Sequence, residues 1–163
     1  MSKRFDGKVA LVTGATSGIG RDTAIAFARE GASVAVTGRR ADRGEALVKE
    51  IEALGAKALY IKADASSDAD AKRAVAATVK AFGRLDIAFN NAGIEGELGP
   101  IVEQTEENYR KVFDINVWGV LASMKHEIPA MLESGGGSII NNASIAGLVG
   151  MPAGSSTSAP SPR

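Results

Sequence analysis

Short apolar, β-branched runs alternate with amphipathic stretches along most of this chain, and the alternation restricts its fold more than any other feature. Strand starts recur near residues 8, 32, 57 and 85. The runs show little polar alternation, which is typical of parallel strands covered by helices on both faces. The strands predicted in this way are residues 8–13, 33–37, 58–61, 85–89 and 138–141.

The stretches between the strands have helical spacing, and three of them end at a glycine, which is a common helix stop. Pro129 lies in the last stretch and is expected to bend or fray its final turn. The predicted helices are residues 19–30, 41–54, 67–82 and 106–132. Strand–helix alternation implies right-handed crossovers. We therefore predict an α/β fold with a doubly wound parallel sheet, Rossmann-like but incomplete, of about five strands with helices on both faces.

The amino-acid composition excludes several classes of function. The chain has 163 residues, 45% hydrophobic and 23% charged, with 19 Lys+Arg against 19 Asp+Glu. This balance argues against disorder and against a nucleic-acid binder, which needs a basic excess. Neither a membrane-length apolar run nor a secretory leader is recognisable, so we expect a cytoplasmic protein without membrane contact. The chain has no Cys and a single His, His126, so we expect no metal site.

The last residues differ in kind from the rest. Residues 152–163 (PAGSSTSAPSPR) hold three of the five prolines and no large apolar side chain. Such a segment buries too little surface to offset the entropy of ordering it. We therefore predict a dinucleotide-binding domain over residues 1–151 and a disordered Ser/Pro-rich tail over residues 152–163.

A glycine-rich loop, TGATSGIG at residues 13–20, joins the first predicted strand to the first helix. Backbone amides at a helix N-terminus form a ready anion site. Gly14 suits a tight turn, Gly18 a close approach of diphosphate, and Gly20 close packing of helix on strand. The alternative is a turn that is glycine-rich without a ligand, because the spacing differs from GxGxxG.

The end of the second strand bears on the choice of dinucleotide. It reads Thr37-Gly38-Arg39-Arg40, without the acid that binds the ribose 2′-hydroxyl of NAD. A guanidinium suits a 2′-phosphate, so NADP is favoured and NAD is the alternative. The two arginines could instead form a solvated helix entry. Asp64, after the third strand, suits an adenine amino group or serves as a plain turn residue.

At this point the chain resembles the short-chain dehydrogenase/reductase family. The resemblance covers about residues 5–152 and rests on TGATSGIG, on Asp64-Ala65, on NNAG at residues 90–93 and on NNAS at residues 141–144, with Asn116 in the long helix. It implies a cofactor site formed by Gly14, Ser17, Gly18, Ile19, Gly20, Arg39, Asp64, Ala65, Asn90, Ala92 and Gly93. It also implies that Ser144 binds the substrate carbonyl or hydroxyl and that Asn116 holds a water in a proton relay.

Read without the resemblance, two of these residues have simpler roles. A polar Asn116 on an apolar helix face must be hydrogen-bonded, and it could tie two backbone segments together. Ser144 follows a strand, where open α/β sheets bind ligands, but it could also cap a turn.

The family's catalytic Tyr and Lys are missing at the expected spacing from Ser144. Those positions hold Thr157 and Ser161, and no Tyr or Lys follows Lys125. We therefore expect a C-terminally truncated family member. The resemblance implies an NAD(P)-dependent oxidoreductase that interconverts a small-molecule alcohol and a ketone or aldehyde, and a homo-oligomer for an intact relative. The alternative is a non-catalytic dinucleotide-binding fragment.

Overall fold

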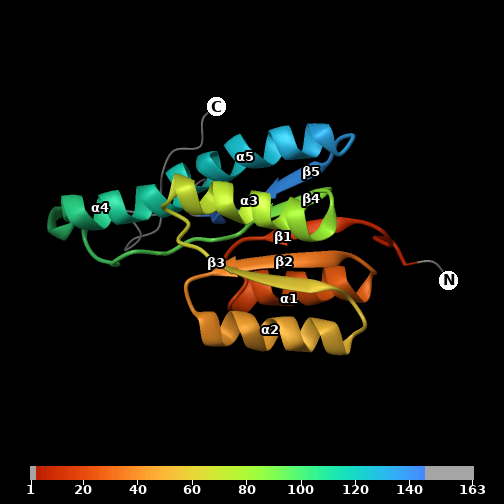
Figure 1. Cartoon of the computed structure of the whole chain (residues 1–163). Helices are drawn as coiled ribbons and strands as arrows, with labels where there is room; N and C mark the ends of the chain where they lie inside the picture. The colour runs from red at the N-terminus through yellow and green to blue at the C-terminus, as the bar shows by residue number, and fades with distance from the viewer. Residues whose placement is uncertain (1–2, 146–163) are drawn as a thin grey trace.

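A single parallel sheet of five strands organises the chain in the computed structural model, which describes residues 3–145 (Figure 1). The strand order is β3-β2-β1-β4-β5. The strands are β1 (Val9–Val12), β2 (Ser33–Gly38), β3 (Ala58–Lys62), β4 (Ile87–Asn90) and β5 (Ser138–Asn141). The predicted doubly wound, Rossmann-like sheet is therefore confirmed.

Helices cover both faces of this sheet. Figure 1 shows α1 and α2 on one face and α3, α4 and α5 on the other. The helical segments are α1 (Gly18–Arg29), α2 (Ala41–Ala53), α3 (Asp68–Phe82), η1 (Ile101–Glu103), α4 (Glu106–Phe113), η2 (Asp114–Trp118) and α5 (Gly119–Glu133). Within the described residues, every helix is too short or too polar to span a bilayer.

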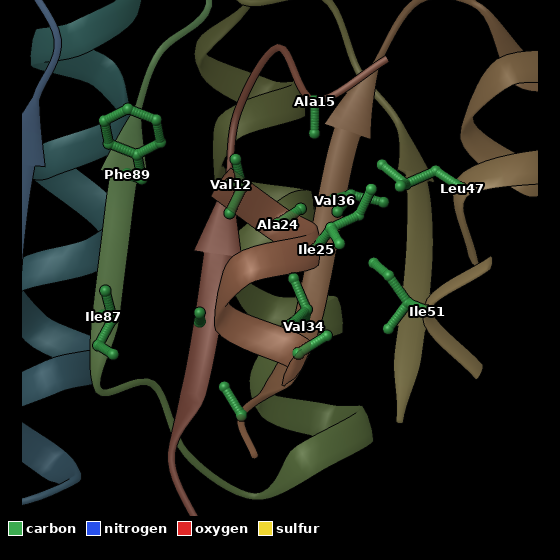
Figure 2. Close-up of a cluster of buried hydrophobic side chains, with 13 residues drawn as sticks. Val12, Ala15, Ala24, Ile25, Val34, Val36, Leu47, Ile51, Ile87 and Phe89 are labelled. Atoms are coloured by element: carbon green, nitrogen blue, oxygen red, sulfur yellow. The ribbon is translucent and has the colours of Figure 1, made fainter. Parts of the chain in front are cut away.

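Two apolar clusters hold the layers together, because successive side chains of a strand point to opposite faces. Val12 and Val34 belong to the cluster beneath α1 and α2, where Ile25 and Ile51 pack on them (Figure 2). Leu11, between Ala10 and Val12, belongs instead to the cluster beneath α3 and α5. The central strands are buried throughout, as their unbroken apolar sequence predicted.

The long helix predicted over residues 106–132 is interrupted. A π-helical turn, η2, separates α4 from α5. A π turn adds a residue to the helical repeat, so the face that points to the core changes there. Val112 before the turn and Ala122 after it are buried, whereas Val117 and Leu121 are about half exposed. Periodicity cannot detect such a single insertion, which is why the sequence predicts one helix.

The last turn of α5 is not frayed at Pro129, because the helix continues to Glu133. Tyr109 on α4 is 52% exposed and packs on Phe113 with ring centroids 4.3 Å apart.

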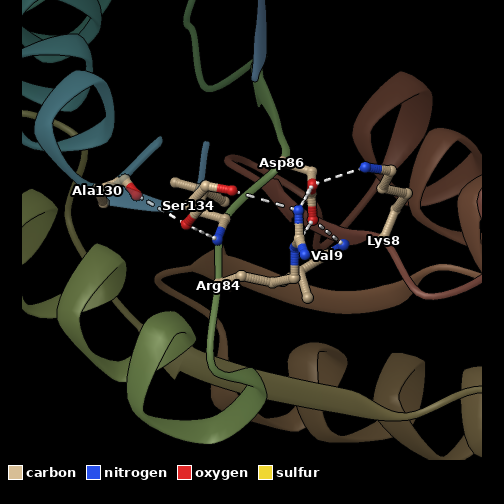
Figure 3. Close-up of polar contacts among 7 residues, drawn as sticks. Lys8, Val9, Arg84, Asp86, Ala130 and Ser134 are labelled. Atoms are coloured by element: carbon tan, nitrogen blue, oxygen red, sulfur yellow. Dashed lines mark hydrogen bonds and ion pairs between the residues drawn. The ribbon is translucent and has the colours of Figure 1, made fainter. Parts of the chain in front are cut away.

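A buried carboxylate, that of Asp86, joins the amino ends of β1 and β4 (Figure 3). Asp86 accepts hydrogen bonds from Arg84 Nε (2.7 Å), the Val9 amide (3.0 Å) and Lys8 Nζ (3.1 Å). Burial alone raises the pKa of Asp86, but these hydrogen bonds outweigh it and lower the pKa. The backbone oxygen of Asp86 accepts from the Ser138 amide, so β1, β4 and β5 meet at this residue.

We expect Asp86→Ala to destabilise the fold by about 3 kcal/mol, because it leaves a buried amide unsatisfied and two cations unpaired. Urea denaturation measures this cost. The matched control is Asp22→Ala, since the Asp22 side chain is 76% exposed, and it should change stability by less than about 0.5 kcal/mol. Equal effects of the two variants would show that Asp86 does not hold the strands together.

Candidate functional site

The glycine-rich loop forms a tight turn between β1 and α1. Gly14 and Gly18 have φ values of 66° and 55°, in the left-handed region that favours glycine. Ser17 precedes the helix but makes no side-chain capping bond. The first amides of α1 therefore lack intrahelical partners and give this end of the helix a partial positive charge.

The turn lies unusually close to the neighbouring strand ends. A Cβ added to Gly14 would be 2.7 Å from Ala92 Cα, and one added to Gly20 would be 2.7 Å from Gly14 O. Both positions therefore exclude a side chain for reasons of space. The turn thus lies at the carboxyl edge of the sheet, where open α/β folds bind ligands.

Thr13 and Asn91 hold the turn in place. Thr13 Oγ1 accepts hydrogen bonds from the Asn91 and Ala92 amides at 3.0 and 3.1 Å. Asn91 Nδ2 donates to the backbone oxygens of Thr13 and Gly14. These contacts fix the glycine turn to the end of β4.

Beside the turn is an open hollow of about 400 Å³, a volume within the range of small-molecule sites. The residues predicted to bind a cofactor that line it are Gly14, Ser17, Arg39, Asp64, Ala65, Ala92 and Gly93. Gly18, Ile19 and Gly20 do not line the hollow, because they form the first turn of α1 at its rim, where Ile19 is 64% exposed. The structure thus brings most of the predicted set to one place.

The positive charge of the hollow comes from the loop after β2. Arg39 lines the hollow, and its charge helps to lower the pKa of Asp64. Arg40 lies directly on the glycine turn: its Nη2 donates to Thr16 Oγ1 at 3.0 Å and to Ser17 Oγ at 2.8 Å. Both arginines therefore line the hollow beside the glycine turn.

Asp64 closes a local turn at the end of β3. Its Oδ1 accepts from the Ser66 amide (3.0 Å) and from Ser66 Oγ (2.8 Å). These bonds are the main reason that the pKa of Asp64 is lowered. Asp64 therefore serves as a turn residue, the simpler of its two predicted roles, and as a charged wall of the hollow.

Asn116 ties two segments together. It lies in the π turn η2, where its Oδ1 accepts from the Ile94 amide at 2.9 Å and its Nδ2 donates to Ile94 O at 2.8 Å. Gly93 lies beside it, because a Cβ there would be 3.4 Å from Asn116 Oδ1. This arrangement matches the structural role that its apolar surroundings predicted.

Ser144 follows β5 at the carboxyl edge of the sheet, and it is exposed. The chain before it is held to β4, because the Asn142 amide donates to Asn90 O at 2.9 Å. Asn142 Nδ2 also donates to Asn91 Oδ1 at 2.9 Å, which links this segment to the residue that fixes the glycine turn. The predicted tail, with Thr157 and Ser161, lies outside the described residues.

Asn90 occupies a different place from the other predicted cofactor residues. Its side chain is buried, and Nδ2 donates to Glu127 Oε2 and to Asn141 Oδ1, both at 3.0 Å. Asn90 thus points beneath α5 and braces β4 against β5.

Four further residues shape the site without having been selected from the sequence: Thr13, Arg40, Asn91 and Glu127. Thr13 and Asn91 belong to the motifs that were recognised, and Arg40 adjoins a selected residue, so their positions carried a signal. Nothing in the sequence marked Glu127 as a site residue, because an acidic residue in an amphipathic helix is ordinarily solvated.

The chain belongs to the short chain dehydrogenase family, whose sequence pattern matches residues 8–160. It is similar to cyclohexanol dehydrogenase of Acinetobacter sp. (strain SE19), with 48% identity over 93% of this chain and 60% of that protein. It is also 48% identical to the A-factor type gamma-butyrolactone 1'-reductase (1S-forming) of Streptomyces virginiae, over 89% of this chain and 57% of that protein.

Solved structures agree with this assignment. NAD+-bound xylitol dehydrogenase matches with a TM-score of 0.92 at 33% identity, over 96% of this chain and 60% of that one. Levodione reductase matches with a TM-score of 0.91 at 37% identity, over 96% and 61%. The chain thus spans about three fifths of the length of these relatives.

We expect Gly14→Ala to destabilise the protein more than Gly18→Ala. Both substitutions force alanine into a left-handed conformation, at about 1 kcal/mol. Only Gly14→Ala also drives a methyl group into Ala92, because nothing lies within 4 Å of a Cβ at Gly18, and overpacking adds about 1–3 kcal/mol. Thermal or urea unfolding of the two variants tests this order, and equal losses would contradict the packing described for the turn.

Proposed function

We propose that this chain binds a nicotinamide dinucleotide with its diphosphate on the glycine turn. The observation that carries the proposal is the turn itself: two glycines in left-handed conformations, a helix end without a side-chain cap, and a hollow beside it. Backbone amides at such a turn neutralise a diphosphate. The residues Gly14, Ser17, Gly18, Ile19 and Gly20 would form this part of the site.

The adenosine would extend along the ends of β2 and β3. Arg39 would lie beside the ribose, with Asp64 and Ala65 at the adenine. Ala92 and Gly93 would contact the adenosine side from the end of β4. Asn90 would support that wall from below, since its side chain is directed to Glu127 and Asn141.

NADP is the favoured cofactor. Gly38 closes β2 without an acid to bind a ribose 2′-hydroxyl, and Arg39 and Arg40 follow it. Arg40 is already hydrogen-bonded to Thr16 and Ser17, so the turn carries a guanidinium where an extra phosphate would need one. NAD is the second candidate, because the similar xylitol dehydrogenase is described as NAD+-bound.

The proposed reaction is the interconversion of a small-molecule alcohol and a ketone or aldehyde. The cofactor supplies hydride transfer when bound, and the protein positions the substrate and moves its proton. Ser144, at the carboxyl edge of the sheet, would hydrogen-bond the substrate oxygen. Asn116 would hold the Ile94 segment, and through it the floor of the site, in place for a proton relay.

Proton transfer requires a group that this 163-residue chain does not offer. The general acid in the resembled family is a Tyr assisted by a Lys, and neither residue type occurs after Lys125. We therefore propose that residues 1–151 act as the dinucleotide-binding domain of such an oxidoreductase, and that the 163-residue chain binds cofactor without turning over substrate.

Arg39→Gln should weaken NADPH binding about tenfold, because it removes one charge-assisted hydrogen bond worth about 1.5 kcal/mol. NADH binding should be unchanged, since NADH lacks the 2′-phosphate. Titration calorimetry measures both affinities, with Arg43→Gln as a control that removes an exposed charge from α2. Equal losses for NADPH and NADH would place Arg39 away from the phosphate. Failure of the folded chain to bind either dinucleotide would overturn the proposed function.

The 163-residue chain should reduce no simple ketone or aldehyde with NADPH above the uncatalysed rate. The absorbance of NADPH follows the reaction, and Ser144→Ala is the matched variant. A clear rate in the unmodified chain that Ser144→Ala abolishes would show that the chain contains a complete catalytic set.

A further inference from the structure

A small cavity lies beneath α5 and adjoins the open hollow at the glycine turn. The two share the lining residues Thr37, Ala63, Asp64, Ala65, Ala92 and Ile115. The volume of the cavity is about 30 Å³, and Asn90, Ser123 and Glu127 are among the polar side chains that line it. A space of roughly 10–15 Å³ accommodates one water when polar partners surround it. The cavity is therefore large enough for ordered water.

Two buried oxygen atoms have no hydrogen-bond partner among the described residues, and they belong to neighbouring side chains that line this cavity. They are Glu127 Oε1 and Asn90 Oδ1. Glu127 is fully buried and Asn90 is 2% exposed. The other oxygen of Glu127 accepts from Asn90 Nδ2 at 3.0 Å. Leaving two acceptors unsatisfied at this depth costs several kcal/mol.

Among residues 3–145, no cation lines the cavity beside Glu127. α3 contributes Ala71, Ala74 and Val75 to the cavity wall, η2 contributes Ile115, and β1 contributes Leu11, with Thr13 directly after it. The other titratable group of the wall is Asp64, an acid. The two basic side chains adjoining Glu127 on α5, Lys125 and His126, contact Asp68 instead, at 3.0 Å each.

We infer that Glu127 is a neutral carboxylic acid in the folded protein below neutral pH, and that it donates its proton to a water in this cavity, which in turn donates to Asn90 Oδ1. This arrangement supplies a partner to both unsatisfied oxygens. An ionised Glu127 would bring two acceptors and a net charge into a space without a cation. Burial raises the pKa of Glu127 to about 7, opposed only in part by the bond from Asn90.

Glu127 is thereby a positioning residue for the end of the sheet. Asn90, which it holds, donates to Asn141 Oδ1 at 3.0 Å and accepts through its backbone from Asn142. Asn141 and Asn142 directly precede the segment that contains Ser144. The protonation of Glu127 is independent of the proposed function, whereas its importance for Ser144 rests on that function.

Infrared spectroscopy of the unmodified 163-residue chain tests the protonation directly. A neutral carboxylic acid in an apolar setting has a carbonyl band distinct from that of a carboxylate. We expect such a band at pH 6, its loss as the pH rises through about 7, and its absence from Glu127→Gln at every pH. Glu133→Gln, which removes an exposed acid from the same helix, should retain the band.

The pH dependence of unfolding provides a second test. The pKa of Glu127 is raised above its ordinary value of 4.5 in the folded state, so its stabilisation is complete below that pH and is lost as the pH rises through about 7. Across this window the unfolding constant should rise by up to about tenfold per pH unit relative to Glu127→Gln. Glu127→Leu should be less stable than Glu127→Gln, because it removes one of the two acceptors of Asn90 Nδ2 and leaves only Asn141 Oδ1.

Two results would overturn the inference. One is a wild-type spectrum without a carboxylic acid band between pH 5 and 6.5, which needs no variant to fold. The other is a constant ratio of unfolding constants for wild type and Glu127→Gln across the whole window. Neither result would bear on dinucleotide binding at the glycine turn, so the two proposals fail separately.

Discussion

The close approach of the glycine turn to the end of β4 is the constraint on which the rest of the site depends. Gly14 leaves no room for a side chain beside Ala92, and Thr13 and Asn91 bond the two segments together. Because β1 and β4 are adjacent parallel strands, their carboxyl ends meet at one edge. The amides of the turn, the loop after β2 and the segment before Ser144 all gather at that edge as a result.

Most of this fold could be predicted from the sequence because its local signals agree with one another. Unbroken apolar runs gave five strands, and four of the five begin within one residue of the prediction, β4 starting at Ile87 instead of 85. The helices ending at Gly31, Gly55 and Gly83 likewise lie close to their predicted bounds. The long helix was predicted less well, since one extra residue in η2 changes the buried face without leaving a mark in composition.

Some residues of the site could be recognised from sequence motifs, whereas the roles of others depend on packing between segments of the fold. Motifs located the glycine turn, Asp64 and Asn116, and for Asp64 the role is set within two residues of the chain, by Ser66. The partners of Asn90 are set by contacts between segments far apart in sequence, Glu127 on α5 and Asn141 on β5. No local pattern distinguishes the buried Glu127 from the exposed Glu133 of the same helix, so its role required the three-dimensional structure.

A buried acid lies near each edge of the sheet, and their pKa values are shifted in opposite directions, down for Asp86 and up for Glu127. At the amino edge, Asp86 is surrounded by Arg84, Lys8 and a backbone amide, and its lowered pKa keeps it charged (Figure 3). Beneath α5, near the carboxyl edge, Glu127 meets an amide side chain and a cavity but no cation, and its pKa rises. The charged cluster around Asp86 stabilises the amino edge, where β1 and β4 are joined. A neutral carboxyl suits a cavity whose wall already includes Asp64, because it adds no second negative charge there.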